Sequence, residues 1–161
     1  MTAVCALLLS LLQIAVPKKD VLTLSDVQSW QAYYAQGLDK DISVSIRNLG
    51  EASTVNGSTR QWNPSPRTKM RTVFIEVNPE KVVLRITVYP RPDETLSAVE
   101  VLRTPEKYVF SSGVKPRLGS YFQAGDKRHT LSLLFLCAAD RDPELAFVTF
   151  KSERTGDPDP L

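Results

Sequence analysis

Apolar and polar residues alternate along much of the chain beyond residue 40, and this pattern predicts a protein built mainly of β-strands. In residues 82–88, valine, leucine, isoleucine and valine occupy every second position, and Arg85 and Thr87 stand between them. A period of two places one set of side chains on a buried face and the other set toward solvent. Applied to the whole chain, the pattern predicts about eight strands, at residues 30–35, 42–46, 73–77, 82–88, 96–102, 108–110, 131–137 and 145–150.

Turn-forming residues separate most of these predicted strands. Proline, glycine and aspartate recur between them, as in Asn78-Pro79, residues 90–93 and Gly125-Asp126. Short strands with hairpin-sized breaks are typical of an antiparallel meander. Residues 24–34 could hold one or more helical turns, whereas the polar stretch 51–68 predicts a long loop.

The N-terminal residues predict secretion. Residues 3–16 form an apolar run of 14, which is short for a membrane span of about 20 residues. The run matches the apolar core of a secretory signal peptide, and Ala15 is the best small residue for cleavage. We therefore expect a signal peptide at residues 1–15 and a single secreted, extracellular domain at residues 16–161. A buried N-terminal helix in a cytosolic protein is the alternative.

Two further features bear on an extracellular protein. The tripeptide Asn56-Gly57-Ser58 is an N-glycosylation acceptor pattern, and it makes Asn56 a candidate glycan site. Cleavage after the signal peptide removes Cys5 and leaves Cys137 as the single thiol, so no intramolecular disulfide is expected. Cys137 lies in an apolar run, which favours a buried, unreactive thiol.

Composition and charge exclude several functional classes. With 161 residues, 42% hydrophobic and 24% charged, the chain fits one globular domain. A net charge of +2 with both signs interspersed is not the basic footprint of a nucleic-acid-binding protein. A single histidine, His129, has no serine or cysteine motif around it, and no glycine-rich phosphate loop or metal-ligand spacing is present. We therefore expect no enzymatic activity, no cofactor and no bound metal.

Both ends of the predicted domain resemble the lipocalin family. Residues 27–43, with Trp30 and with Gln28 in place of the usual glycine, resemble the first strand of a lipocalin. Residues 133–154 are similar to the last two barrel strands, with an apolar strand that carries Cys137, an acidic proline-containing turn and a closing Arg154. The resemblance implies an all-β fold, an eight-stranded antiparallel up-and-down β-barrel that lacks the C-terminal helix of the family. It also implies that Trp30 and Arg154 pack together at the closed end of the barrel.

The functional expectation follows from this fold. A barrel of eight strands can enclose one small ligand among inward-facing side chains. We expect a secreted carrier of a small lipophilic molecule, with a cavity lined by Ile42, Val44, Ile46, Val73, Ile75, Leu84 and Ile86. The same residues could form the core of a β-sandwich, and the alternative is therefore a secreted interaction module without a small-molecule ligand. A cell-surface receptor is a candidate partner, and neither nucleic acid nor a membrane span is expected.

Overall fold

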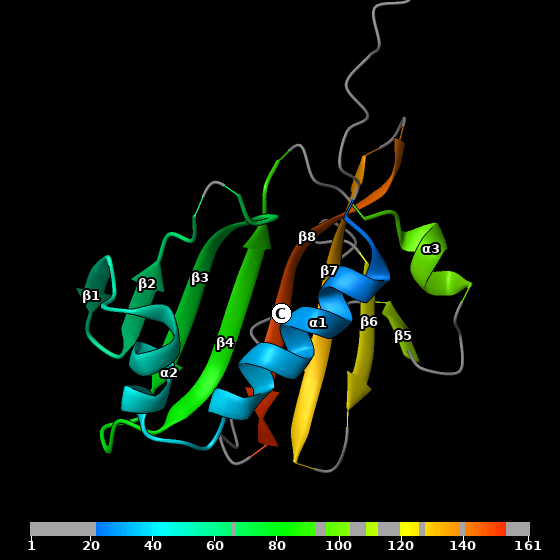
Figure 1. The fold of residues 1–161 in the computed structure, drawn as a ribbon. Helices are drawn as coiled ribbons and strands as arrows, with labels where there is room; N and C mark the ends of the chain where they lie inside the picture. Colours follow the sequence, from blue (N-terminus) through cyan, green and yellow to red (C-terminus); the bar gives the residue numbers. More distant parts are fainter. Residues whose placement is uncertain are drawn as a thin grey trace, which may run out of the picture.

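The fold is one open antiparallel β-sheet with helices packed on one of its faces (Figure 1). It was obtained as a computed structural model, which describes residues 22–65, 67–92, 96–103, 109–112, 120–125, 128–138 and 141–153. In chain order the elements are α1 (Leu24–Tyr34), η1 (Ala35–Gly37), α2 (Ile42–Leu49), β1 (Thr54–Asn56), β2 (Thr59–Trp62), β3 (Met70–Val77), β4 (Val83–Pro90), α3 (Ala98–Leu102), β5 (Val109–Ser112), β6 (Ser120–Gly125), β7 (His129–Ala138) and β8 (Arg141–Ser152).

The sheet consists of two meanders joined side by side. Its strand order is β1-β2-β3-β4-β8-β7-β6-β5, so β4 and β8 are neighbours at the seam. Across the seam Ile86 pairs with Phe150, which in turn pairs with Leu131. The segment that contains α3 leads from β4 at the seam to β5 at one edge, and β1 forms the opposite edge.

Helix α1 lies across the middle of the sheet in Figure 1. Thr23 and Asp26 form a capping box at its N-terminus, which satisfies backbone donors that the first helical turn leaves free. Four buried residues, Leu24, Val27, Trp30 and Tyr34, recur at intervals of three or four and form one face of the helix. These side chains join strand residues such as Val73, Ile86 and Phe150 in one hydrophobic core.

Helix α2 contradicts the strand predicted at residues 42–46. Asp41 is its N-cap and accepts a hydrogen bond from the Ser43 amide at 2.8 Å. Hydrogen bonds from the side chain and the backbone amide of Ser43 hold the pKa of Asp41 below its ordinary value. The helix ends at Gly50, whose φ of 79° is accessible to glycine at little cost.

The predicted eight-stranded barrel is wrong, and so is the alternative β-sandwich. In the described part of the chain all named strands belong to a single sheet, and its edge strands β1 and β5 do not pair with each other. Segments expected to supply three strands form α1, α2 and α3 instead, and the first two helices cover the face that a barrel would enclose (Figure 1). The helical turns compatible with residues 24–34 are present as α1.

Other strand predictions are confirmed. Residues 73–77, 82–88, 131–137 and 145–150 lie in or beside β3, β4, β7 and β8, and residues 108–110 overlap β5. The predicted long loop at 51–68 contains the short hairpin β1–β2, and β6 was not predicted.

The residues expected to line a barrel therefore have other roles. Ile42, Val73, Ile75 and Ile86 are buried in the core between helices and sheet, and Val44, Ile46 and Leu84 are half-buried. Trp30 lies on a helix and not on a first strand. Arg154 and the predicted signal peptide lie outside the described residues, so the proposed Trp30–Arg154 contact is not part of the fold described here. None of the described helices is long and apolar enough to cross a bilayer.

Candidate ligand-binding pocket

A pocket of about 490 Å³ opens between α1, the C-terminal end of α2, β2 and the start of β3. Its volume lies within the range of small-molecule sites, about 300 to 1,000 Å³. We call it the aromatic pocket, because both tryptophans of the chain and two of its five tyrosines are among the lining residues. The described lining residues are Ser29, Trp30, Tyr33, Tyr34, Asn48, Leu49, Glu51, Ser53, Trp62, Asn63, Pro64, Thr68 and Met70.

The aromatic pocket has a buried apolar floor and a polar rim. Trp30, Tyr34 and Trp62 are only 8%, 4% and 4% exposed, whereas Tyr33 is 47% exposed. The exposed polar lining residues are Ser29, Asn48, Glu51, Ser53 and Asn63. An apolar floor with a few polar groups at the opening is the usual composition of a site for a small organic molecule.

Hydrogen bonds hold the aromatic side chains in place. The Tyr33 hydroxyl donates to the Asn48 carbonyl at 3.2 Å, and the Trp62 indole N–H donates to the Gly50 carbonyl at 2.9 Å. Both acceptors lie at the C-terminal end of α2, so α1 and β2 are each tied to that helix. Fixed rings lose little conformational freedom when a ligand binds, which favours affinity.

Tyr34 is buried below these rings and remains uncharged over the physiological range. Its hydroxyl lies 3.2 Å from the sulfur of Met70, and its ring meets that of Tyr33 edge-on with centroids 5.0 Å apart. Burial, with a smaller contribution from Tyr33, raises the pKa of Tyr34 to about 12. The floor of the pocket therefore carries no charge at neutral pH.

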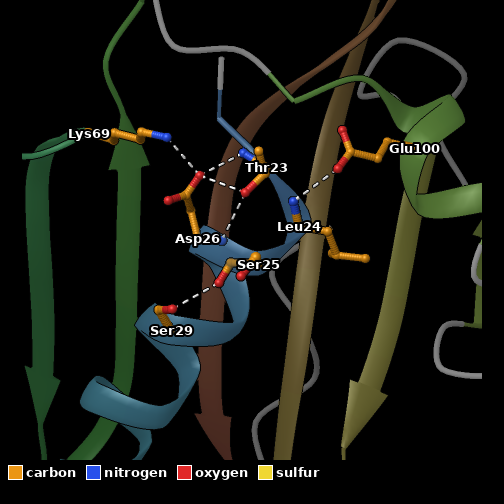
Figure 2. A network of polar contacts seen from close by, with 7 residues as sticks. All are labelled: Thr23, Leu24, Ser25, Asp26, Ser29, Lys69 and Glu100. Atoms are coloured by element: carbon orange, nitrogen blue, oxygen red, sulfur yellow. Dashed lines mark hydrogen bonds and ion pairs between the residues drawn. The ribbon is translucent and has the colours of Figure 1, made fainter. Parts of the chain in front are cut away.

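A polar network holds the N-terminal end of α1, one of the helices that line the pocket (Figure 2). Lys69, next to the pocket residues Thr68 and Met70, forms an ion pair with Asp26 at 2.9 Å. Glu100 accepts a hydrogen bond from the Leu24 amide at 3.2 Å and connects α3 to the same helix end. Through Lys69 the connection between β2 and β3 is held against α1, so two segments that both supply lining residues are linked.

Asp26 is stabilised in its charged form by this network. Partial burial by itself raises the pKa of Asp26, but hydrogen bonds from Lys69 and Thr23 outweigh burial. The pKa of Asp26 consequently lies below its ordinary value of 3.8. Asp26 is therefore ionised, and the ion pair is formed, at neutral pH.

The single histidine belongs to a separate polar cluster. Asp39 accepts a hydrogen bond from the Ser152 hydroxyl at 2.6 Å with one oxygen and lies 3.1 Å from His129 Nε2 with the other. In a nucleophilic triad the serine hydroxyl faces the histidine, whereas here serine and histidine both face the carboxylate. The adjacent cavity has a volume of about 20 Å³, which is room for one water molecule. No group of three or more potential metal ligands occurs among the described residues.

The predicted ligand residues are not brought together in the aromatic pocket. None of the seven residues expected to line a barrel is among its lining residues, whereas Trp30, expected to close the barrel, is. Asn56 is exposed at the end of β1, next to Gly57, and glycosylation there remains a prediction. The backbone of Cys137 lies in β7, and its side chain lies outside the described part of the structure.

Sequence reasoning missed the importance of Trp62 and Glu51. Both lie in the stretch 51–68, which was expected to be a loop because it is polar. A tryptophan in an otherwise polar segment was the available signal, since large aromatic residues are costly to expose. Its position next to α1 depends on the β2–β3 pairing, in which Trp62 is opposite Val73.

Comparisons with known proteins do not assign the chain to a family. No family model matches the sequence, and no curated protein matches it. Among solved structures, the chain is similar to the crystal structure of a DUF4309 family protein (YjgB) from Bacillus subtilis subsp. subtilis str. 168. The two share 7% sequence identity with a TM-score of 0.44, over 71% of this chain and 79% of the other. A likeness this distant supports no conclusion about the function of the chain.

Proposed function

We propose that this protein is a binding protein for a small, largely apolar molecule, which it holds in the aromatic pocket. The observation that carries the proposal is the convergence of Trp30, Trp62, Tyr33 and Tyr34 on one cavity of about 490 Å³. These four residues come from α1 and β2, and the fold has to bring them together. The predicted signal peptide at residues 1–15 adds the proposal that binding takes place outside the cell.

The physical basis of binding is the transfer of apolar ligand surface from water onto these rings. Burial of apolar area is worth about 25 cal/mol per Å². Aromatic pairs in offset or edge-on geometry add about 0.5 to 1.5 kcal/mol beyond burial. Because the rings of Tyr33 and Trp62 are already held by hydrogen bonds to α2, less free energy is lost in ordering them when a ligand binds.

The test is titration of the full chain with N-phenyl-1-naphthylamine, an uncharged fluorescent probe. Both tryptophans of the chain line the pocket, so probe binding is expected to quench tryptophan emission while probe emission rises. A Ser29→Phe variant places a ring at an exposed position of α1 that lines the pocket, and it should reduce probe affinity about tenfold or more by occupying the space.

The matched control is Gln28→Phe, which adds the same ring to the same helix at an exposed position outside the lining. This variant should bind the probe as the unmodified protein does. The proposal fails if well-folded protein does not bind the probe, or if Ser29→Phe and Gln28→Phe bind it equally well.

A further inference from the structure

We infer that the ligand of the aromatic pocket is a small organic cation, such as a quaternary or alkylated ammonium compound, with Glu51 as its counter-ion. This inference rests on the proposed function, because it specifies the chemistry of the molecule bound at the same site. It follows from three properties of the lining: the number of aromatic rings, the sign of the charge, and the supply of hydrogen-bond donors.

The first property is the density of aromatic rings. Four aromatic side chains line the pocket, and two of them are tryptophans. The face of an aromatic ring carries partial negative charge, and tryptophan is the strongest partner for a cation. An alkylated ammonium group has an apolar surface and a positive charge, so it benefits both from apolar enclosure and from the ring faces.

The second property is the sign of the local charge. Glu51 is the one charged side chain among the described lining residues, and no lysine or arginine is among them. The C-terminal end of α2 also lies at the pocket, through Asn48 and Leu49, and carries the partial negative charge of a helix C-terminus. The basic residue of that last turn, Arg47, is exposed and is not part of the lining.

The third property is that several lining donors are already used within the protein. The hydroxyls of Ser29 and Thr68 donate to the carbonyls of Ser25 and Ser65. The polar groups of Tyr33 and Trp62 likewise donate to carbonyl groups of the chain. The remaining side-chain donors, on Asn48, Ser53 and Asn63, are exposed at the rim, and no cation is among the described lining residues to hold a negatively charged ligand.

The experiment compares choline with 3,3-dimethylbutan-1-ol, in which carbon replaces the charged nitrogen. Each compound is titrated into the full chain, with displacement of N-phenyl-1-naphthylamine and tryptophan emission as the readouts. Choline is expected to bind about tenfold more tightly than its neutral isostere. Added salt should weaken the binding of choline and leave that of the isostere unchanged.

Glu51→Gln tests the counter-ion, and Glu80→Gln is its control. Glu80 is an exposed glutamate in the turn between β3 and β4, at the opposite end of β3 from the pocket residue Met70. Glu51→Gln should lower choline affinity about threefold to tenfold while retaining affinity for the isostere. Glu80→Gln should change neither.

The outcomes separate this inference from the proposed function. If N-phenyl-1-naphthylamine binds but choline and its isostere compete equally well, the cation inference is overturned and the proposed function stands. If Glu51→Gln binds choline as tightly as the unmodified protein, Glu51 is not the counter-ion and the inference as stated is wrong. Failure of the uncharged probe to bind contradicts the proposed function itself.

Discussion

At the N-terminus of α1 one carboxylate oxygen of Asp26 accepts three hydrogen bonds. Asp26 Oδ2 accepts from the Thr23 amide at 2.7 Å, from the Thr23 hydroxyl at 2.8 Å and from Lys69 Nζ at 2.9 Å. A negative charge in the first turn is also stabilised by the positive end of the helix. Together with the N-cap Thr23, Asp26 therefore fixes the start of α1, and it ties the helix to Lys69, next to the pocket residues Thr68 and Met70 (Figure 2).

Asp26→Asn should lower the free energy of unfolding by about 0.5 to 1 kcal/mol at pH 7, discounted for partial solvent exposure. Asparagine can still accept hydrogen bonds, so the decrease in the free energy of unfolding measures the contribution of the negative charge. Because the pKa of Asp26 is lowered on folding, its contribution is fully present above about pH 4 and is lost as the pH falls through the folded-state value. Denaturant unfolding at pH 7 and at pH 2.5 measures this. A difference between the two proteins that is undiminished at pH 2.5 would contradict the assignment.

At the scale of elements, α2 shows how one pattern can satisfy two structures. In Ile42-Ser-Val-Ser-Ile46 the apolar residues alternate, which is the strand pattern, but positions 42 and 46 are also one helical turn apart. Leu49 continues that helical face, and Ile46 and Leu49 both pack against the core. Asp41 before the run and Gly50 after it are helix-boundary residues, and they favour the helix over the strand.

Alanine substitutions distinguish helix from strand at this element. Ile46→Ala should lower the free energy of unfolding by about 1 to 3 kcal/mol, because it removes packing against the core. Val44→Ala should change it by less than about 0.5 kcal/mol, since alanine is the better helix former and offsets the small loss of contact. Denaturant unfolding of the two variants provides the test. Equal losses would indicate that both side chains share one buried face, as in a strand.

At the scale of the whole molecule, the seam between β4 and β8 joins the two meanders into one sheet. Phe150 on β8 is 1% exposed, pairs with Ile86 across the seam and stacks on Tyr34 of α1 with centroids 6.3 Å apart. It therefore contacts elements from both halves of the chain and the helix that covers them. The stability of the aromatic pocket depends on this contact, because Tyr34 also forms part of the pocket floor.

Phe150→Ala should lower the free energy of unfolding by about 3 to 5 kcal/mol. As a control, Leu136→Ala on β7 removes a side chain that is 51% exposed and should change it by less than about 0.5 kcal/mol. Thermal and denaturant unfolding followed by tryptophan emission report on both variants. A small effect of Phe150→Ala would mean that the two meanders and α1 are not held together at this residue.

The sequence by itself determined the strands whose alternation is long and uninterrupted, at β3, β4, β7 and β8, because a period of two is a local property. It did not determine that α1 and α2 form as helices on the sheet, because short apolar runs fit either structure until the core selects one. Only the tertiary structure decided that the sheet stays open and that α1 covers it. It also created the aromatic pocket, because Trp30 and Trp62 are 32 positions apart in sequence and line one pocket only in the folded chain.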